Sequence, residues 1–255
     1  MVNMLRQAIA GHRTATPYDQ ATVAAVPRPH VETPLRGVAN LRYVRRLQRG
    51  LDLAIASLAL VSFAALLPLL AAAIAIDSRG PVFYSQIRIG LNRRRVPAPH
   101  PGPERRKTVQ PGRPFRVWKL RTMVTDAEQH GPRWAARNDN RVTRVGRVLR
   151  RSRLDEVPQF WNVLRGQMSV VGPRPERLCF INLLEKDVPH YRDRLLVRPG
   201  ITGLAQVENG YDSDLESVRR KVALDRRYIR EIGLWTDLRI LLRTFAVVLK
   251  GSGAN

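Results

Sequence analysis

Two adjacent carboxylates, Asp155 and Glu156, lie in a strongly basic stretch of the chain. They belong to the run LDEVPQ at 154–159, and the run GPRP follows at 172–175. Two carboxylates can hold Mg²⁺ between a protein and the phosphates of a substrate, and one carboxylate can attack phosphorus as a nucleophile. The pair is therefore a candidate site for phosphate chemistry that uses a metal ion.

The same two acids would also suit the start of an ordinary helix. Asp155 is a typical N-cap residue, Pro158 is tolerated in a first turn, and Gly166 favours a C-terminal cap. A helix start would also suit phosphate, because its free N–H groups and its dipole attract anions. The acid pair by itself leaves capping and catalysis both open.

Four cations elsewhere in the chain favour phosphate binding. Lys119 and Arg121 are two residues apart in an expected strand, so both side chains point from one face. Arg174 lies between two prolines, which fix the backbone and lower the entropic cost of presenting a guanidinium group. Arg198 opens the similar run RPGITG, with a rigid turn, glycines and a hydroxyl. We expect these four cations to bind substrate phosphates.

The composition limits the classes of protein to consider. The 255 residues have a formal net charge of +23, which favours an anionic partner such as nucleic acid, anionic lipid or a phosphorylated substrate. A single cysteine excludes a disulfide scaffold within one chain. The histidines are scattered, and no glycine-rich run matches a Walker loop or a dinucleotide fingerprint. The sequence therefore indicates neither a zinc site nor a nucleotide-binding α/β fold.

An uncharged apolar segment covers residues 53–76. At about 1.5 Å per residue it could cross a hydrocarbon core of about 30 Å. Arginines flank it on both sides, whereas a spanning helix normally leaves its basic flank in the cytoplasm. One interpretation is a re-entrant helix that breaks at Pro68 and returns to the same side. The other is a plain transmembrane helix with a tolerated proline.

We expect a mainly α-helical fold with one small β-hairpin. The hairpin strands are predicted at 82–89 and 115–121, and both belong to a catalytic domain at 81–250. The segment 93–112 between them is rich in proline and charge, which is typical of a flexible loop.

Two further regions precede this domain. Residues 1–44 are interpreted as a disordered basic tail and residues 45–80 as a membrane-embedded helix. Towards the other end of the chain, one helix is predicted at 214–231 and an amphipathic one at 235–250. The amphipathic helix either packs on the core or lies in a membrane interface.

Over residues 45–250 the chain resembles the bacterial sugar transferases, the monotopic phosphoglycosyl transferases. The runs that carry the resemblance are DSRGPVF at 77–83, KLRTM at 119–123, RVTRVG at 141–146, LDEVPQFWNVLRG at 154–166, MSVVGPRP at 168–175 and VRPGITGLAQV at 197–207. Their order and spacing favour catalysis over capping for Asp155 and Glu156.

The resemblance implies a monotopic protein on the cytoplasmic face of the bacterial inner membrane, with a re-entrant helix and interfacial amphipathic helices. It implies transfer of a sugar-1-phosphate from a UDP-sugar to undecaprenyl phosphate, with release of UMP. That reaction would be the first membrane step of exopolysaccharide, capsule, O-antigen or glycoprotein glycan assembly. Anionic membrane lipid and polysaccharide-assembly proteins are expected as further partners, and nucleic acid is not.

The family's residue roles carry over to matching positions. Asp155 would attack the sugar-linked phosphorus and form an aspartyl-phosphosugar intermediate, with Glu156 assisting and both acids holding Mg²⁺. Lys119 and Arg174 would neutralise phosphate oxygens in the transition state. We expect the nucleotide sugar to contact Pro175, Thr202 and Gln206.

Some positions depart from the family's usual pattern. Ala64 and Ala65 stand where a Ser-Pro break is common, and Pro68 follows about one turn later. Arg153 replaces the usual Ser or Thr before the acid pair. The longer relatives carry four more membrane helices, so we expect a minimal catalytic module.

Two other functions compete with the transferase. One is a membrane-anchored basic protein that binds nucleic acid, but only 6% of the residues are aromatic and no nucleic-acid motif is present. The other is an inactive scaffold of a polysaccharide-assembly complex. The intact Asp155, Glu156 and Arg174 argue against a scaffold.

Overall fold

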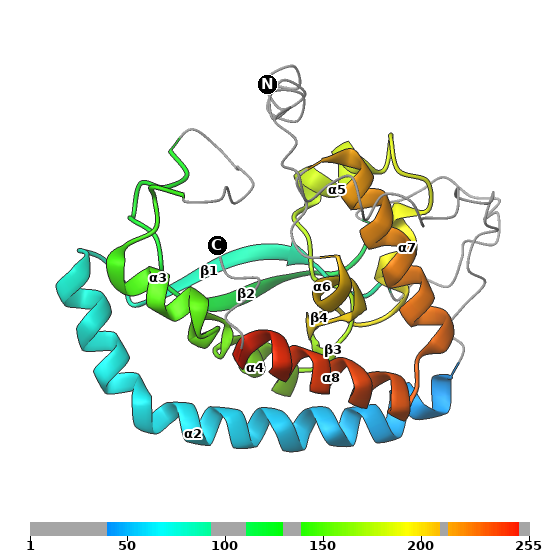
Figure 1. Ribbon diagram of the computed structural model, residues 1–255, viewed down its shortest axis with the longest axis horizontal. Coiled ribbons are helices and arrows are strands. Elements are labelled where there is room, and N and C mark those ends of the chain that lie inside the picture. Colours follow the sequence, from blue (N-terminus) through cyan, green and yellow to red (C-terminus); the bar gives the residue numbers. More distant parts are fainter. Residues whose placement is uncertain (1–39, 93–110, 130–138, 210–213, 250–255) are drawn as a thin grey trace, which may run out of the picture.

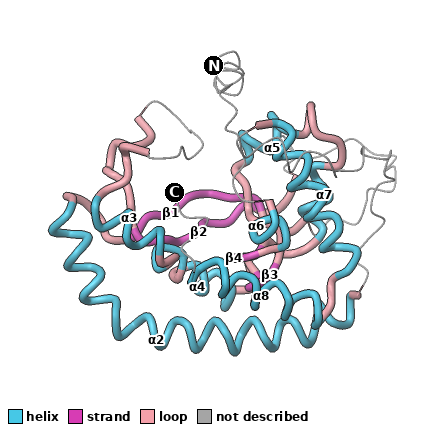
Figure 2. Tube along the Cα trace, viewed as in Figure 1, coloured by secondary structure: helices cyan, strands magenta, loops and turns pink. Residues whose placement is uncertain are grey.

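The computed structural model describes residues 40–92, 111–129, 139–209 and 214–249. The described part is mainly helical and contains two separate two-stranded sheets (Figures 1 and 2). The predicted mainly α-helical fold class is therefore confirmed. The predicted tail up to residue 39 and the predicted loop at 93–110 lie outside the described residues.

The predicted hairpin is present with nearly the predicted bounds. Strand β1 (Phe83–Ile89) pairs antiparallel with β2 (Pro114–Leu120), and Tyr84 lies opposite Lys119. The second sheet was not predicted. It pairs β3 (Ser169–Val171) with β4 (Gly200–Thr202) in parallel, and each strand has only three residues, too few to show an alternating pattern.

A 30-residue helix, α2 (Gln48–Asp77), lies along one side of the molecule. It follows directly from the helical segment η2 (Tyr43–Leu47), so the helical part of the chain begins within what we predicted as the end of the tail. Figure 1 shows α2 bending in its C-terminal half, so that both its ends lie on the side of the other elements. That half contains Pro68, which removes one helical hydrogen bond and crowds the preceding turn.

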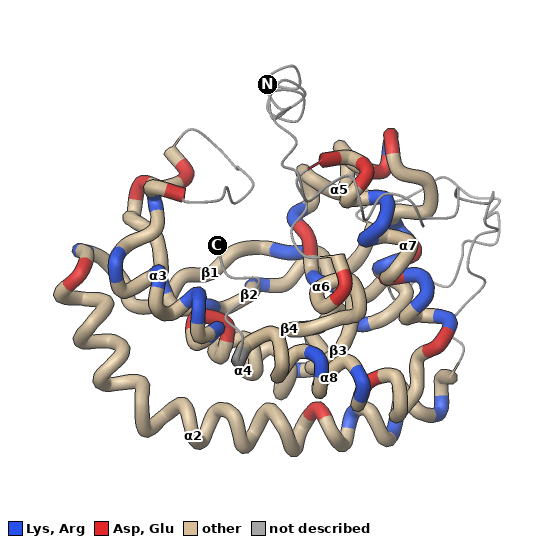
Figure 3. Tube along the Cα trace, in the orientation of Figure 1, with Lys and Arg blue, Asp and Glu red and all other residues tan. Residues whose placement is uncertain are grey.

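Most residues of α2 are apolar, and few of them are buried. Only Gln48, Asp52, Ala56, Phe63 and Ile74 are buried along it. Its most apolar window has a mean hydropathy of 2.5 and is 11% buried, so by length and composition the helix could cross a membrane. Figure 3 shows the long uncharged stretch of α2, in contrast to the elements above it, which carry many charged residues.

The other helical elements connect and cover the strands. They are α3 (Arg144–Arg151), η3 (Leu154–Glu156), α4 (Gln159–Leu164), α5 (Leu178–Leu184), η4 (Tyr191–Leu196), α6 (Leu204–Glu208), α7 (Leu215–Glu231) and α8 (Leu234–Leu249). A capping box between Asp214 and Ser217 starts α7. The helices predicted at 214–231 and 235–250 are both confirmed.

The last helix, α8, packs on the core, as one of the two interpretations of its pattern predicted. Asp237 and Ile240 are buried against the core, which also includes residues of β2, β3, α4 and α7. Trp235, Leu242 and Phe245 on the same helix are 65% exposed or more. One face of α8 thus packs on the core, and an apolar face is left open.

Candidate active site

The acid pair lies in a tight turn between α3 and α4. Arg153 adopts a left-handed conformation (φ 59°) and redirects the chain after α3, and η3 then carries Asp155 and Glu156. Both acids are buried, at 5% and 7% exposure. The N-cap prediction for Asp155 is wrong, because α4 starts later, at Gln159, with Pro158 as its N-cap residue. Gly166, predicted to favour the C-terminal cap, directly follows the C-cap residue Arg165 of α4 and has φ 68°.

Two cations hold Glu156. Lys119, at the end of β2, places its Nζ 2.7 Å from Glu156 Oε1. Arg174 places Nη2 2.5 Å from the same oxygen and Nη1 3.4 Å from Oε2. Segments far apart in the chain therefore meet at this carboxylate, as the sequence predicted for Lys119, Arg174 and the acids.

The pKa values of the two acids are shifted in opposite directions. Burial by itself raises the pKa of Glu156, but the charges of Arg174 and Lys119 and their hydrogen bonds outweigh burial and hold that pKa well below its usual range. Burial raises the pKa of Asp155, and the neighbouring Glu156 charge adds to the rise. The charges of Lys119, Arg150 and Arg174 oppose it. Among the described residues, no group hydrogen bonds to the Asp155 carboxylate.

The backbone of Arg174 is held as firmly as its side chain. Arg194 donates from Nη2 to the Arg174 carbonyl at 2.9 Å and is itself buried and ion-paired to Asp225 at 2.6 Å. Gly172 donates to the Thr202 carbonyl at 2.9 Å. A Cβ at Gly172 would come within 2.5 Å of the backbone of the neighbouring run at 198–203, so only glycine permits this close approach. The runs GPRP and RPGITG are therefore packed against each other.

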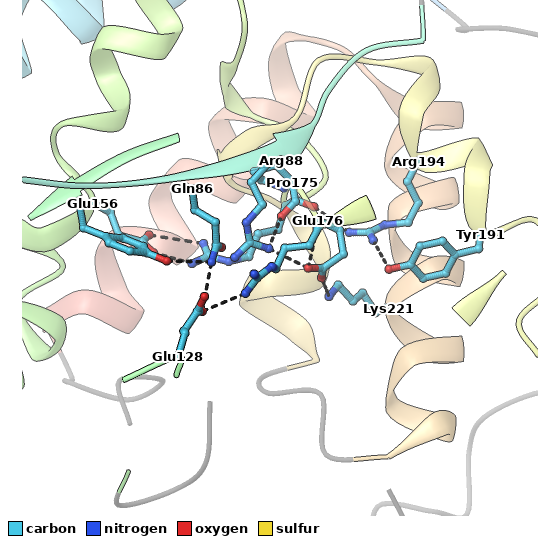
Figure 4. A network of polar contacts seen from close by, with 12 residues as sticks. Gln86, Arg88, Glu128, Glu156, Pro175, Glu176, Tyr191, Arg194 and Lys221 are labelled. Atoms are coloured by element: carbon cyan, nitrogen blue, oxygen red, sulfur yellow. Dashed lines mark hydrogen bonds and ion pairs between the residues drawn. The ribbon is translucent and has the colours of Figure 1, made fainter. Parts of the chain in front are cut away.

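A charged network continues from Arg174 along the face of β1 (Figure 4). Arg88 donates to Glu176 Oε1 at 2.7 Å and to the Pro175 carbonyl at 3.3 Å. Beyond it Glu128 accepts hydrogen bonds from Arg177 and Gln86. Burial raises the pKa of Glu176, but the charges of Lys221, Arg88 and Arg194 outweigh burial and lower it overall. Pro175 lies in a crevice with Arg174 and Glu176.

Arg121 has a different position from the one we predicted. It lies just beyond β2 and turns its guanidinium group to the end of α2, where it donates to the carbonyls of Ser78 at 2.5 Å and Arg79 at 2.8 Å. Gly80 has φ +124°, and a Cβ there would collide with this side chain. The expectation that Arg121 and Lys119 share one face fails because the strand ends at Leu120. Arg121 thus satisfies carbonyls at a helix end, and its position gives no support to phosphate binding.

Three other predicted residues bond outside the acid pair. Arg198 donates from Nε to the Gly166 carbonyl at 3.2 Å, beyond the end of α4. Thr202 shares a hydrogen bond of 2.7 Å with Thr244 of α8, and Gln206 donates to the Ile201 carbonyl at 2.9 Å. The structure therefore brings together Asp155, Glu156, Lys119 and Arg174. Pro175 follows Arg174 and accepts from Arg88, and the other predicted residues are engaged elsewhere.

Of the two carboxylates, Asp155 is the one that could bind Mg²⁺. Asp155 is free to accept a cation, whereas the Glu156 oxygens already accept from Lys119 and Arg174. No group of three or more His, Cys, Asp or Glu side chains in the described part could form an all-protein metal cage. Mg²⁺ commonly binds one or two carboxylates and completes its shell with substrate phosphates and water. The residues therefore suit an ion that arrives with a phosphorylated substrate.

Three charged residues of the site were not predicted from the sequence: Arg150, Glu176 and Arg88. Arg150 acts on Asp155 by charge while its Nε donates to Thr122 Oγ1 at 2.9 Å. Its only signal was its place five residues before Asp155, in a run with many arginines. Glu176 and Arg88 gave no signal, because their pairing joins β1 to the segment after Pro175.

The structure combines an exposed apolar helix that is long enough to cross a membrane with a buried acid pair and two fixed cations, a combination consistent with phosphate chemistry at a membrane. The bacterial sugar transferase family model matches residues 43–251. The chain belongs to the bacterial sugar transferase family.

Several characterised relatives align with most of the chain. The N-acetylgalactosaminephosphotransferase of Aeromonas hydrophila, which acts with undecaprenyl phosphate, is 40% identical over 82% of this chain and 45% of its own length. The UDP-glucose:undecaprenyl-phosphate glucose-1-phosphate transferase of Caulobacter vibrioides is 41% identical over 81% of this chain and 71% of its own length. The enzyme of the same name from Escherichia coli is 37% identical, and the match covers 88% of this chain and 43% of that protein. The chain thus matches less than half of two of these relatives.

Proposed function

We propose that this chain transfers a sugar-1-phosphate from a UDP-sugar to undecaprenyl phosphate and releases UMP. The observation that carries the proposal is the Asp155 carboxylate. It is buried, accepts no hydrogen bond among the described residues, and lies next to a carboxylate that two cations hold. The relatives' names supply the substrates. Relatives of similar identity are named for N-acetylgalactosamine and for glucose, so the proposal names UDP-hexoses as a class.

In the first step, an oxygen of Asp155 would form a bond to the sugar-linked phosphorus. The bond from that phosphorus to the bridging oxygen would break, and UMP would leave with the electron pair. In the second step, an oxygen of the lipid phosphate would attack the same phosphorus and release Asp155 as a carboxylate. The product is a sugar linked to the lipid through a diphosphate, and the enzyme returns to its starting state.

The cations would lower the barrier by charge. Lys119 and Arg174 lie at Glu156 on the side of the pair where phosphate oxygens would gather negative charge. Glu156 would keep both cations in place, because its lowered pKa keeps it ionised. Mg²⁺, held by Asp155 with substrate oxygens, would offset phosphate charge when bound.

Undecaprenyl phosphate is a membrane lipid, so the active site must lie close to the membrane. We propose that α2 enters the cytoplasmic leaflet of the inner membrane and returns to the same side, and that the open face of α8 lies in the interface. The supporting observations are the bend in the C-terminal half of α2, which contains Pro68, and the exposed Trp235, Leu242 and Phe245. In the cell, this reaction would start the assembly of a surface polysaccharide.

A single-turnover experiment tests the covalent step. With UDP-sugar and Mg²⁺ but no lipid acceptor, about one UMP per active site should appear in a burst. Mass spectrometry after a rapid quench should find a phosphosugar within residues 154–159, and hydroxylamine should remove it. If UMP appears only when both substrates are present and no adduct is trapped, a one-step transfer replaces this mechanism.

A further inference from the structure

The N-terminal turns of α2 contact the two segments that support the active site. Arg49 donates from Nη1 to the Val163 carbonyl at 2.6 Å and from Nη2 to the Leu164 carbonyl at 2.8 Å. These carbonyls end α4, the short helix that begins three residues after Glu156. A six-residue helix has few internal hydrogen bonds, so the groups that satisfy its last carbonyls determine where it lies.

Asp52, one turn further along α2, contacts the other segment. Its Oδ1 accepts from Ser169 Oγ at 2.9 Å and from the Val170 amide at 2.8 Å, and the residue is 2% exposed. Ser169 and Val170 form the start of β3, and Arg174 follows the end of that strand. Asp52 therefore holds the strand that presents Arg174 to Glu156.

A third contact joins the same part of α2 to the end of β3. Gln48 donates to Tyr228 Oη at 3.1 Å and to Asp237 Oδ2 at 2.9 Å. Tyr228 Oη lies 3.2 Å from the Val171 carbonyl and 2.9 Å from Asp237 Oδ1, and these two acceptors share its single proton. The polar side chains of α2 thus reach both ends of β3, one directly and one through Tyr228.

A helix that served only as a membrane anchor would not need these buried polar contacts, which cost free energy to form. Burying a carboxylate is unfavourable unless it is fully paired, and an apolar residue of similar size often stabilises as well. Asp52 Oδ2 has no hydrogen-bond partner, although the charges of Arg49 and Arg198 act on this carboxylate. Apolar packing would attach α2 to the core, but it would not fix the orientation of α4 and β3 as directional hydrogen bonds do.

We propose that Arg49 and Asp52 are positioning residues for the transfer reaction. They use α2 as a common template for α4 and β3, and so set the distance between the acid pair and Arg174. That distance matters because the 2.5 Å contact between Arg174 and Glu156 joins the two segments. The catalytic consequence rests on the proposed function, whereas the geometric claim does not.

The test compares four variants of the full chain in membranes: Arg49→Ala, Asp52→Ala, Asp52→Asn and, as a matched control, Arg46→Ala. Arg46 lies in η2, directly before α2, and it is exposed. Hydrogen exchange of the peptides at 154–166 and 169–175 reports the geometry, with α7 as an internal reference. Steady-state kinetics with UDP-sugar then separates kcat from KM.

Asp52→Ala should speed exchange at 169–175, and Arg49→Ala should speed it at 154–166, with α7 unchanged. A misplacement of about 1 Å can cost on the order of 100-fold in rate, so we expect kcat to fall roughly 10- to 100-fold with a smaller change in KM. Asp52→Asn should recover most of the rate, because its amide oxygen can still accept both hydrogen bonds.

Unchanged exchange in both peptides, or kcat values within about twofold of Arg46→Ala, would overturn the inference. If Asp52→Ala does not accumulate, Arg49→Ala still decides it, because this variant leaves the Asp52 contacts with β3 in place. If the unmodified chain transfers no sugar-phosphate at all, the proposed function fails, and the exchange data alone still decide whether α2 positions the two segments.

Discussion

At the scale of single residues, Asp155 and Glu156 are neighbours in the chain but differ in proton affinity. Glu156 is paired with two cations that keep it ionised, whereas burial raises the pKa of Asp155. Acids whose surroundings separate their pKa values usually have separate roles in catalysis. Here Glu156 is bound by Lys119 and Arg174, and Asp155 is the carboxylate left to react.

Asp155→Asn should lower transfer at least about 1,000-fold, because an amide oxygen cannot act as the attacking carboxylate. Asp155→Glu should also fail, since the added methylene moves the oxygen. UMP release per enzyme measures both. Asp187→Asn, a change at an exposed aspartate, serves as the control. Near-normal turnover in either Asp155 variant would remove its role as nucleophile.

Arg174→Lys should reduce kcat about 100-fold although the charge is kept. Arg174 donates from two nitrogens to Glu156, and a lysine would replace this fork with one mobile ammonium. Arg192→Lys at an exposed position is the matched control. Equal kinetics for Arg174→Lys and the control would mean that Arg174 contributes only to the turn between its prolines.

The pH dependence of kcat gives a third test. Asp155 must lose its proton to attack, so activity should rise with pH through its raised pKa. The Lys119 charge lowers that pKa, and Lys119→Gln should raise it and move the acid limb roughly one pH unit higher. The exposed Arg116→Gln on the same strand should leave the limb in place. A shift to lower pH for Lys119→Gln would contradict this account of Asp155.

At the scale of elements, α2 is both an open apolar helix and a partner of the core. Its exposed leucines suit lipid, whereas Gln48, Arg49 and Asp52 make directional contacts with the soluble part. The bend keeps its two ends on one side (Figure 1). A straight helix of 30 residues, at about 1.5 Å per residue, would be long enough to separate them across a bilayer.

Cysteine labelling tests this topology. In a Cys179→Ser background, Leu41→Cys and Ile87→Cys lie before and after α2, and both positions are exposed. Neither should react with an impermeant reagent added to intact cells, and both should react after the cells are opened. Labelling of only one position from outside would mean that α2 spans the membrane, and labelling of both would place both ends outside; either result would contradict this topology.

At the scale of the whole molecule, a buried polar cluster joins the start of the described chain to its end. Asp237 of α8 accepts from Tyr43 Oη at 2.6 Å, from Gln48 at 2.9 Å and from Tyr228 Oη at 2.9 Å. One carboxylate therefore links η2, α2, α7 and α8. Because it is the shared acceptor, its loss would take an acceptor from three buried donors.

Asp237→Ala should destabilise the fold by about 2–3 kcal/mol and lower Tm by roughly 5–10 °C. Thermal unfolding in detergent, followed by far-UV circular dichroism, measures the shift. Glu231→Ala, which breaks the exposed pair with Arg227, should change Tm little. Equal Tm values for the two variants would show that the cluster contributes no more than a surface ion pair.

The sequence by itself determined the elements whose signals are local. An uncharged apolar run predicted α2, an amphipathic pattern predicted α8, and the helix predicted at 214–231 corresponds to α7. The acid pair and Arg174 were identifiable because carboxylates and a proline-framed arginine suit phosphate at the level of single side chains. These features depend on neighbours within a few residues, which any sequence displays.

Only the tertiary structure decided which distant groups meet. It assigned Arg121 to the end of α2 and Arg198 to the end of α4, and it revealed the three-residue strands β3 and β4. A cation looks the same in a sequence whether it faces a substrate or a backbone carbonyl. Its role depends on contacts across many intervening residues, and packing settles those contacts because buried polar groups must find partners.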